Sequence, residues 1–308
     1  RDILDLDSLS IEEYEMILQT AAEMKKIMKR DIKKVPSLRG KSIINLFYEP
    51  STRTRTSFEL AGKYLGADVV NITTASSSVV KGECLRDTIL TVQSMACDAI
   101  VMRHPIEGAA AYAAEVADPV IINAGDGAHQ HPSQTMLDLY SILKTQGTLH
   151  NLTITMVGDL KYGRTVHSLL MAMKYFNPTF RFVACEELRM PREYIEFCRR
   201  QGINFEEHTD FSREVIDSTD ILYMTRVQRE RFFNEEDYVR LKNSYILTSE
   251  KMALAKEKMA VLHPLPRVNE ISTKVDADPR AMYFEQVRNG RFVRMALIST
   301  LLEGLYED

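Results

Sequence analysis

Ser51-Thr52-Arg53-Thr54-Arg55 is the stretch that decides the fold, because an apolar run precedes it and a helical pattern follows it. The run 43–47 is typical of a strand, and residues 56–61 begin a helix. A helix start presents free backbone N–H groups and the positive end of the helix dipole, so hydroxyl and guanidinium groups placed there can bind an anion with them. The stretch therefore predicts a phosphate site. The alternative is an ordinary helix start, with Ser51 as the N-cap and both arginines in solvent.

Strand and helix patterns alternate on both sides of this stretch. In the first half, strands are expected at 42–47, 67–72, 98–102 and 119–122, and helices at 11–29, 51–65, 84–96 and 107–116. In the second half, strands are expected at 152–157, 180–184, 203–206, 220–225, 244–247 and 259–262. This alternation predicts an α/β fold with parallel strands and crossover helices.

We expect two doubly wound parallel-sheet domains. The first comprises residues 1–135 and a returning C-terminal helix at 288–308, and the second comprises residues 136–287. The pattern at 291–303 is that of an amphipathic helix with one apolar side, which we expect to pack on the first domain.

The composition limits the partners, the compartment and the cofactors. The chain has 308 residues, a formal net charge of −4 and no long block of Lys and Arg, so neither nucleic acid nor a membrane is an expected partner. No apolar run is long enough for a membrane span, and no signal peptide pattern opens the chain. The four cysteines form no Cys-x-x-Cys pair, which is typical of reduced thiols in a cytoplasmic protein. Of the seven histidines only His129 and His131 are close together, so we expect no metal and no other cofactor.

Polar residues gather where the predicted strands of the first half end. Arg103 follows one strand, and His131 with Gln134 follows another. The carboxyl ends of parallel strands meet at one edge of a sheet, so we expect these side chains to lie near residues 51–55. The intervening segment 73–83 carries Lys81 before a glycine, and is either a flexible linker or a loop that delivers a positive charge to an anion.

The second half offers groups suited to carboxylates and to an amide. Gly158-x-x-x-x-Gly163-Arg164-Thr165 departs from a P-loop, since Arg replaces the P-loop Lys and Asp159 adds a negative charge; Arg164 is better suited to grip a carboxylate. Arg226 ends another strand and is either a second carboxylate ligand or a solvated side chain. The loop 263–267, His-Pro-Leu-Pro-Arg, is either a mere turn or a rigid loop that presents carbonyl groups to an amide. Together these features indicate direct transfer of a group between two small anions.

Taken in order, these motifs resemble those of the aspartate carbamoyltransferase catalytic chains. The resemblance rests on 51–55, 103–105, 131–134, 158–169, 226–228 and 263–267, and covers nearly the whole chain. It implies transfer of the carbamoyl group from carbamoyl phosphate to the amine of L-aspartate, in pyrimidine synthesis. Residue 80 departs from the pattern, because it is Val where many relatives carry a second Lys.

The resemblance also implies the site residues and the assembly. The residues implied for carbamoyl phosphate are Ser51, Thr52, Arg53, Thr54, Arg103, His131 and Gln134, the backbone of Leu265 and Pro266, and Ser77 of a neighbouring subunit. Those implied for aspartate are Arg164, Arg226 and Gln228, and Lys81 of a neighbouring subunit. Catalysis is implied for Arg53, Thr54, Lys81, Arg103 and His131, in a homotrimer with shared active sites. Whether a regulatory chain binds is left open.

Two alternatives to this function remain. The first is an ornithine-type carbamoyltransferase, which has a Cys in the late His-x-Leu-Pro loop where this chain has Pro264. The second is a non-catalytic homologue that only assembles with partner chains. The full set of cationic and polar residues argues against the second, because an inert scaffold gains nothing from their desolvation costs.

Overall fold

The computed structural model describes residues 2–73, 81–127, 129–227, 229, 234–242 and 245–303. The chain forms two compact units, one of Arg1–Tyr140 with Val287–Asp308 and one of Ser141–Gln286. Both boundaries fall inside helices, α5 (Pro132–Gln146) and α11 (Tyr283–Leu302). Each unit contains one parallel sheet, so the predicted α/β fold with two parallel-sheet domains is confirmed.

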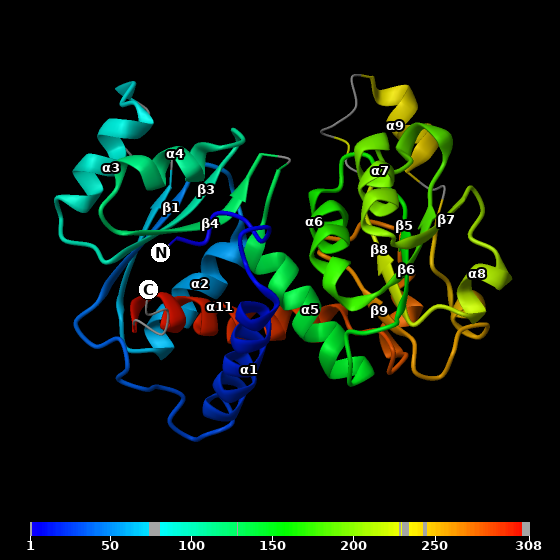
Figure 1. Cartoon of the computed structure of the whole chain (residues 1–308), viewed down its shortest axis with the longest axis horizontal. Coiled ribbons are helices and arrows are strands. Elements are labelled where there is room, and N and C mark those ends of the chain that lie inside the picture. The colour runs from blue at the N-terminus through cyan, green and yellow to red at the C-terminus, as the bar shows by residue number, and fades with distance from the viewer. Residues whose placement is uncertain are drawn as a thin grey trace. The chain divides into compact units, whose positions relative to one another are not determined.

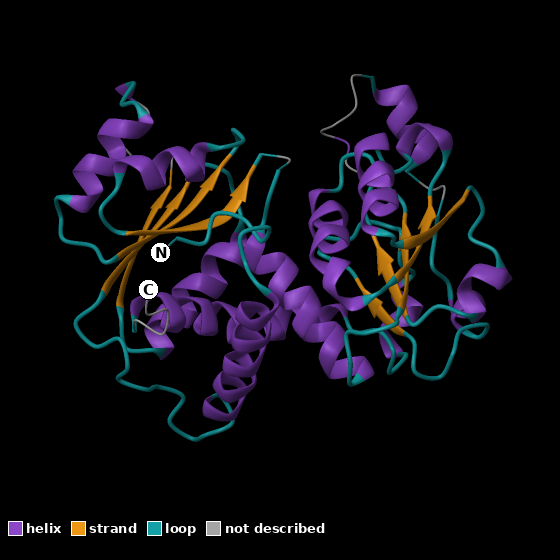
Figure 2. Ribbon diagram, in the orientation of Figure 1, coloured by secondary structure: helices purple, strands orange, loops and turns teal. Residues whose placement is uncertain are grey.

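The first unit is built on a sheet of four parallel strands in the order β2-β1-β3-β4. Their bounds are β1 (Ser42–Phe47), β2 (Asp68–Thr73), β3 (Ala99–His104) and β4 (Val120–Asp126). All four arrows point to the same edge of the sheet (Figure 2). The chain goes from β1 to a neighbour on one side and then to β3 on the other. The carboxyl ends of β1 and β3 therefore flank a topological switch point, the usual ligand site of such a sheet.

Helices cover both faces of this sheet. The helices besides α5 and α11 are α1 (Ile11–Ile27), α2 (Thr52–Tyr64), α3 (Leu85–Gln93) and α4 (Ala109–Val116). Apolar side chains of α3 and α4 join those of β1, β3 and β4 in one buried cluster, while α1, α2 and α11 lie on the opposite face (Figure 1). The first helix has a capping box, in which Ser10 and Glu13 each bind the backbone N–H of the other.

The C-terminal helix joins the first unit, as predicted, but the prediction that it is amphipathic is wrong. From Phe292 to Thr300 every residue is buried. The reason is that several helices pack around it: Arg294 contacts Ser57 of α2, Gly290 lies close to Leu137 of α5, and Lys25 of α1 lies over the ring of Phe292. A helix surrounded in this way needs no polar side.

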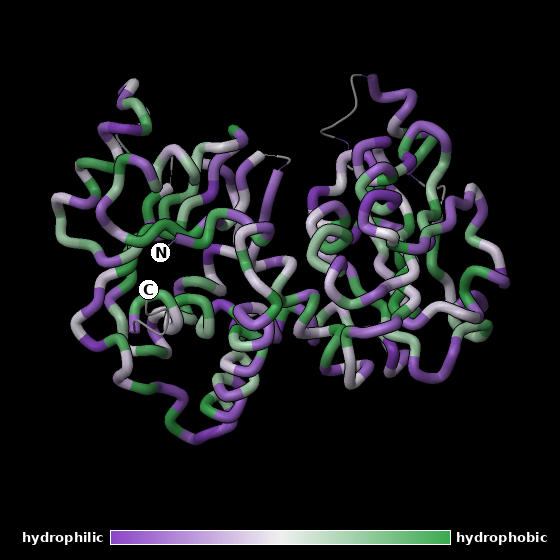
Figure 3. Tube along the Cα trace, viewed as in Figure 1, coloured by the Kyte–Doolittle hydropathy of each residue, from purple (hydrophilic) through white to green (hydrophobic). Residues whose placement is uncertain are grey.

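The second unit is built on a sheet of five parallel strands in the order β7-β6-β5-β8-β9. Their bounds are β5 (Thr153–Val157), β6 (Thr179–Val183), β7 (Asn204–His208), β8 (Ile221–Met224) and β9 (Ala260–Leu262). Its helices, besides the ends of α5 and α11, are α6 (Arg164–Ala172), η3 (Met173–Phe176), η4 (Glu186–Leu188), α7 (Arg192–Gln201), α8 (Arg213–Asp217), α9 (Glu235–Leu241), α10 (Ser249–Met252) and η6 (Thr273–Ala277). The switch point of this sheet lies between β5 and β8. The edge strand β7 is mainly hydrophilic (Figure 3), as expected where one side faces water.

One predicted strand of the second unit is wrong. The described part of 244–247 contains no strand and forms only an isolated bridge between Leu247 and Ile271. The apolar side chain of Leu247 is instead fully buried in the core of this unit. A short apolar run indicates burial, but by itself it does not distinguish a strand from a buried loop.

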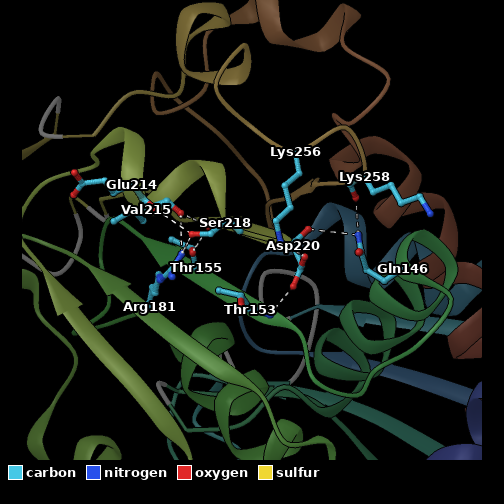
Figure 4. Close-up of polar contacts among 11 residues, drawn as sticks. Gln146, Thr153, Thr155, Arg181, Glu214, Val215, Ser218, Asp220, Lys256 and Lys258 are labelled. Atoms are coloured by element: carbon cyan, nitrogen blue, oxygen red, sulfur yellow. Dashed lines mark hydrogen bonds and ion pairs between the residues drawn. The ribbon is translucent and has the colours of Figure 1, made fainter.

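Hydrogen bonds and an ion pair hold the amino ends of β5 and β8 together (Figure 4). The Asp220 carboxylate accepts the backbone N–H of Thr153 at 2.8 Å and pairs with Nζ of Lys256 at 2.8 Å. The Gln146 amide donates to the carbonyl oxygens of Asp220 at 3.4 Å and Lys258 at 2.9 Å. These contacts stabilise the amino edge of the sheet. The predicted site residues lie at the opposite edge, after the carboxyl ends of the strands.

Candidate active site

The predicted phosphate-binding turn, Ser51–Thr54, leads from β1 into α2. Ser51 occupies the N-cap position with an extended backbone, but its side chain makes no capping hydrogen bond. Thr52 and Arg53 are exposed, and the first turn of α2 contains no acidic residue. The side chain of Ser51 therefore does not compete with an anion for the first N–H groups of the helix. This geometry favours a phosphate site over an ordinary capped helix.

Arg103 stands beside this turn. It pairs with Phe47 in the register of β3 against β1, so its side chain begins next to the end of β1. Nη1 donates to the carbonyl oxygen of Ala124 at 3.3 Å, and Nε lies 3.3 Å from Oε2 of Glu49. Burial lowers the pKa of Arg103; Glu49 opposes the shift and the nearby Arg53 adds to it. Two neighbouring guanidinium groups with one carboxylate leave a local excess of positive charge, which suits a phosphate dianion.

His131 and Gln134 stand at the start of α5, after β4. The His131 carbonyl accepts the N–H groups of Gln134 at 3.0 Å and Thr135 at 3.2 Å, which fixes this first turn. The His131 side chain is buried, and the Gln134 side chain is half-buried. Nε2 of Gln134 donates to Oδ1 of Asp138 at 3.0 Å. The first unit therefore places a guanidinium at the end of β3, and an imidazole and an amide after the neighbouring strand β4.

Arg164 begins α6, after a tightly constrained turn that follows β5. Gly158 has φ +113°, and a Cβ there would lie 2.6 Å from Oγ1 of Thr225, so only glycine fits. The buried Asp159 carboxylate accepts the N–H of Tyr162 at 2.9 Å. A P-loop needs its N–H groups for phosphate, and here one of them already binds a carboxylate. The turn therefore positions Arg164 and does not form a nucleotide site.

Arg226 follows β8, the strand next to β5. Oγ1 of Thr225 donates to the Val157 carbonyl at 2.8 Å and accepts the N–H of Asp159 at 2.8 Å. These bonds join the carboxyl ends of the two strands. Arg164 begins the helix after β5, and Arg226 follows β8, so both arginines come after strand ends that are fixed to each other. This arrangement suits the binding of two carboxylate groups.

The loop after β9 is held by a buried His–Glu pair. Nε2 of His263 lies 2.6 Å from Oε1 of Glu270, and Nδ1 accepts the N–H of Leu265 at 2.7 Å. Burial lowers the pKa of His263, although Glu270 opposes the shift. A neutral His263 that accepts at Nδ1 must carry its proton on Nε2, facing the Glu270 carboxylate. Leu265 is thereby held at φ +56°, an uncommon conformation for a residue other than glycine, and this is typical of a constrained functional loop.

The described structure places the predicted residues in two sets. The first unit contains Ser51, Thr52, Arg53, Thr54, Lys81, Arg103, His131 and Gln134, and the second contains Arg164, Arg226, Leu265 and Pro266. Ser77 and Gln228 lie outside the described residues, as does Val80. In each unit the strand-end residues follow neighbouring strands, β1, β3 and β4 in one and β5, β8 and β9 in the other.

Sequence reasoning missed four residues that support these sets: Glu49, Asp138, Glu270 and Arg294. The spacing of Gln134 and Asp138, four residues apart on a helix, was a usable signal. Glu49 and Arg294 act across long separations in sequence, for which a single chain offers no pattern. Glu270 lies seven residues from His263 across an irregular loop, which has no fixed spacing either.

Metal ligands and membrane spans were also sought in the described residues. No group of three or more His, Cys, Asp and Glu side chains there could hold a metal ion. His129 is exposed and lies 3.4 Å from the Asp126 carboxylate. Among the helices of the described residues, none combines the length and the apolar character that a membrane span requires. All four cysteines are free thiols.

Each of the two parallel-sheet units carries cationic residues after its strand ends, an arrangement suited to small anionic ligands. The family model for the carbamoyl-P binding domain of aspartate/ornithine carbamoyltransferases matches residues 1–144, and the model for the Asp/Orn binding domain matches residues 150–301. The chain therefore belongs to the aspartate/ornithine carbamoyltransferase family and is a transferase. The predicted family membership is confirmed.

Individual relatives place the chain near the aspartate enzymes of this family. It is 55% identical over 303 residues to the aspartate carbamoyltransferase catalytic subunit of Parabacteroides distasonis, covering 98% of this chain and 97% of that one. The catalytic subunit of M. jannaschii aspartate transcarbamoylase has a TM-score of 0.92 at 43% identity, covering 100% and 99% of the two chains. Aspartate transcarbamoylase of Trypanosoma cruzi, solved with carbamoyl phosphate and aspartate, has a TM-score of 0.91 at 38% identity, covering 97% and 96%.

Proposed function

We propose that this protein is the catalytic chain of an aspartate carbamoyltransferase. It transfers the carbamoyl group of carbamoyl phosphate to the α-amine of L-aspartate, which yields N-carbamoyl-L-aspartate and phosphate for pyrimidine synthesis. The observation that carries the proposal is the placement of Arg103 beside Arg53 and the start of α2, at the switch point of the first sheet. We assign carbamoyl phosphate to residues 1–135 with 288–308, and aspartate to residues 136–287.

The reaction proceeds by direct attack of the amine on the carbonyl carbon. Arg103, Thr54 and His131 stabilise the negative charge that develops on the carbonyl oxygen. Phosphate then leaves as the C–O bond breaks, and its charge is spread over Arg53, the start of α2 and Lys81. The departing phosphate takes the proton of the amine, so the reaction needs no protein general base.

The remaining ligands orient the two substrates. The Gln134 side chain and the carbonyls of Leu265 and Pro266 bind the carbamoyl amide. Those carbonyls are supported by the buried His263–Glu270 pair, which limits the freedom of their loop. Arg164, Arg226 and Gln228 bind the two carboxylates of aspartate. Rate acceleration comes from orientation and preorganised charge.

The main competing function is carbamoylation of ornithine. The guanidinium groups of Arg164 and Arg226 would repel the cationic side chain of ornithine, and Pro264 stands where the ornithine enzymes have a Cys. The test is a carbamoylation assay with carbamoyl phosphate and either amino acid. We expect carbamoyl aspartate from aspartate and only background product from ornithine. Citrulline formation at a comparable rate would contradict the assignment to aspartate.

We further propose a cytoplasmic homotrimer in which Lys81 and Ser77 complete the site of a neighbouring subunit. The exposed position of Lys81 and the free thiols are consistent with this arrangement. Lys81→Ala and Arg103→Ala subunits, each inactive alone, should regain part of their activity when mixed, because some sites then combine two intact surfaces. The measurement is carbamoyl aspartate formation after subunit exchange, with the native mass determined in parallel. Absence of any recovery in confirmed mixed trimers would argue against shared sites.

A further inference from the structure

Asp138 is a fully buried carboxylate directly behind a proposed substrate ligand. It lies four residues after Gln134 on α5, so both side chains lie on the same face of that helix. Oδ1 of Asp138 accepts Nε2 of Gln134 at 3.0 Å, and Asp138 is 0% exposed. The mechanism above gives Asp138 no role, although burying a carboxylate is costly.

A buried arginine from the far end of the chain compensates this charge. Arg294 of α11 donates through Nη1 to Oγ of Ser57 at 3.1 Å, and its guanidinium lies 5.2 Å from the ring centre of Phe58. Burial lowers the pKa of Arg294 to about 9, with a further lowering by Arg103, while Asp138 opposes the shift. Attraction between Arg294 and Asp138 therefore favours the ionised form of each.

An ionised carboxylate fixes the direction of the neighbouring amide. A carboxylate only accepts hydrogen bonds, so the NH₂ group of Gln134 must face Asp138. Turning the amide over would place two acceptors, Oε1 of Gln134 and Oδ1 of Asp138, 3.0 Å apart with no hydrogen between them. Oε1 of Gln134 is then the atom left for substrate, and no described residue donates a hydrogen bond to it.

We propose that Asp138 is a positioning residue that holds Oε1 of Gln134 toward the substrate and so selects an acyl phosphate that carries an N–H donor. This inference rests on the proposed function, and gives that function a determinant of specificity. Carbamoyl phosphate offers an NH₂ group to Oε1, whereas acetyl phosphate offers a methyl group. Arg294 contributes by keeping Asp138 ionised. A site built around an acceptor discriminates strongly against an analogue that lacks the matching donor.

The direct test is Asp138→Asn. The positive charge of Arg294 attracts the new side-chain oxygen, so the new NH₂ group faces Gln134 and the Gln134 amide turns over. We expect kcat/KM for carbamoyl phosphate to fall by about tenfold or more. The inhibition constants of acetyl phosphate and inorganic phosphate, measured against carbamoyl phosphate, should stay within about twofold, because neither ligand uses Oε1 as an acceptor. Equal weakening of all three ligands, or no change in any, would overturn the proposal.

Asp118→Asn is a matched control. Asp118 also accepts a glutamine side chain, Nε2 of Gln93 at 3.1 Å, but it is exposed and precedes β4 at the amino end of the sheet. The same chemical change there should leave all three constants unaltered. If Asp138→Asn does not fold, Asp138→Ser removes the carboxylate without adding an N–H₂ group, and the same selective loss for carbamoyl phosphate is expected, with a smaller size.

A double-mutant cycle separates a positioning role from a structural one. In a Gln134→Leu background, Asp138→Asn should have no further selective effect, since Asp138 acts through Gln134. A full additional loss would assign Asp138 another role and refute the inference. The parent protein is assayed alongside with aspartate. If it forms no carbamoyl aspartate, the proposed function fails, while competition binding of carbamoyl and acetyl phosphate still decides the role of Asp138.

Discussion

Replacing Arg53 with alanine is expected to lower carbamoyl aspartate formation by about 10²-fold or more. In the proposed mechanism, the side chain supplies positive charge where the leaving phosphate becomes most negative, next to the start of α2. Because Arg53 is exposed, its removal should change the free energy of unfolding by only about 0.5 kcal/mol or less. The two measurements are steady-state kinetics with saturating aspartate and denaturant unfolding.

Arg39→Ala is the control for Arg53→Ala. Arg39 is also exposed, and it precedes β1 at the amino end of the sheet. It should therefore match the parent in both measurements. Unchanged product formation by folded Arg53→Ala protein would refute the phosphate role of the turn.

Replacing Arg226 with glutamine should raise the KM for aspartate by about 10²-fold, because a charge-assisted bond to a carboxylate is lost at an ordered site. Arg226 lies in the second unit, whereas the phosphate-binding turn lies in the first. The dissociation constant of carbamoyl phosphate, measured without aspartate, should therefore change little. Initial rates over a range of aspartate concentrations, together with direct binding of carbamoyl phosphate, separate the two effects.

Arg192→Gln makes the same change at an exposed arginine on α7 that pairs with Glu196 at 2.8 Å, and should not affect either constant. A comparable loss of affinity for carbamoyl phosphate and aspartate in Arg226→Gln would indicate a general structural defect. That result would remove the reason for assigning Arg226 to the aspartate carboxylates.

Most of the strand and helix assignments could be predicted because the determinants are local. The apolar run of β1 and the turn into α2 follow from neighbouring residues, and parallel pairing brings Arg103 to the same edge as that turn. The same reasoning failed at 245–247, where burial of Leu247 comes from a loop packed into the core. It also failed for α11, because the helices that cover the side expected to face water are distant in sequence.

The sequence alone was sufficient to predict the α/β class and most of the strands in their order along the chain, and it shows which residue types follow them. These depend on periodicity and on residue types at short spacing. Only the tertiary structure decided which groups support the proposed site: Glu49 beside Arg103, Glu270 beside His263, and Arg294 near Asp138. The physical reason is that a buried charge is tolerated only with a compensating partner, and the fold, not the local sequence, brings that partner into range.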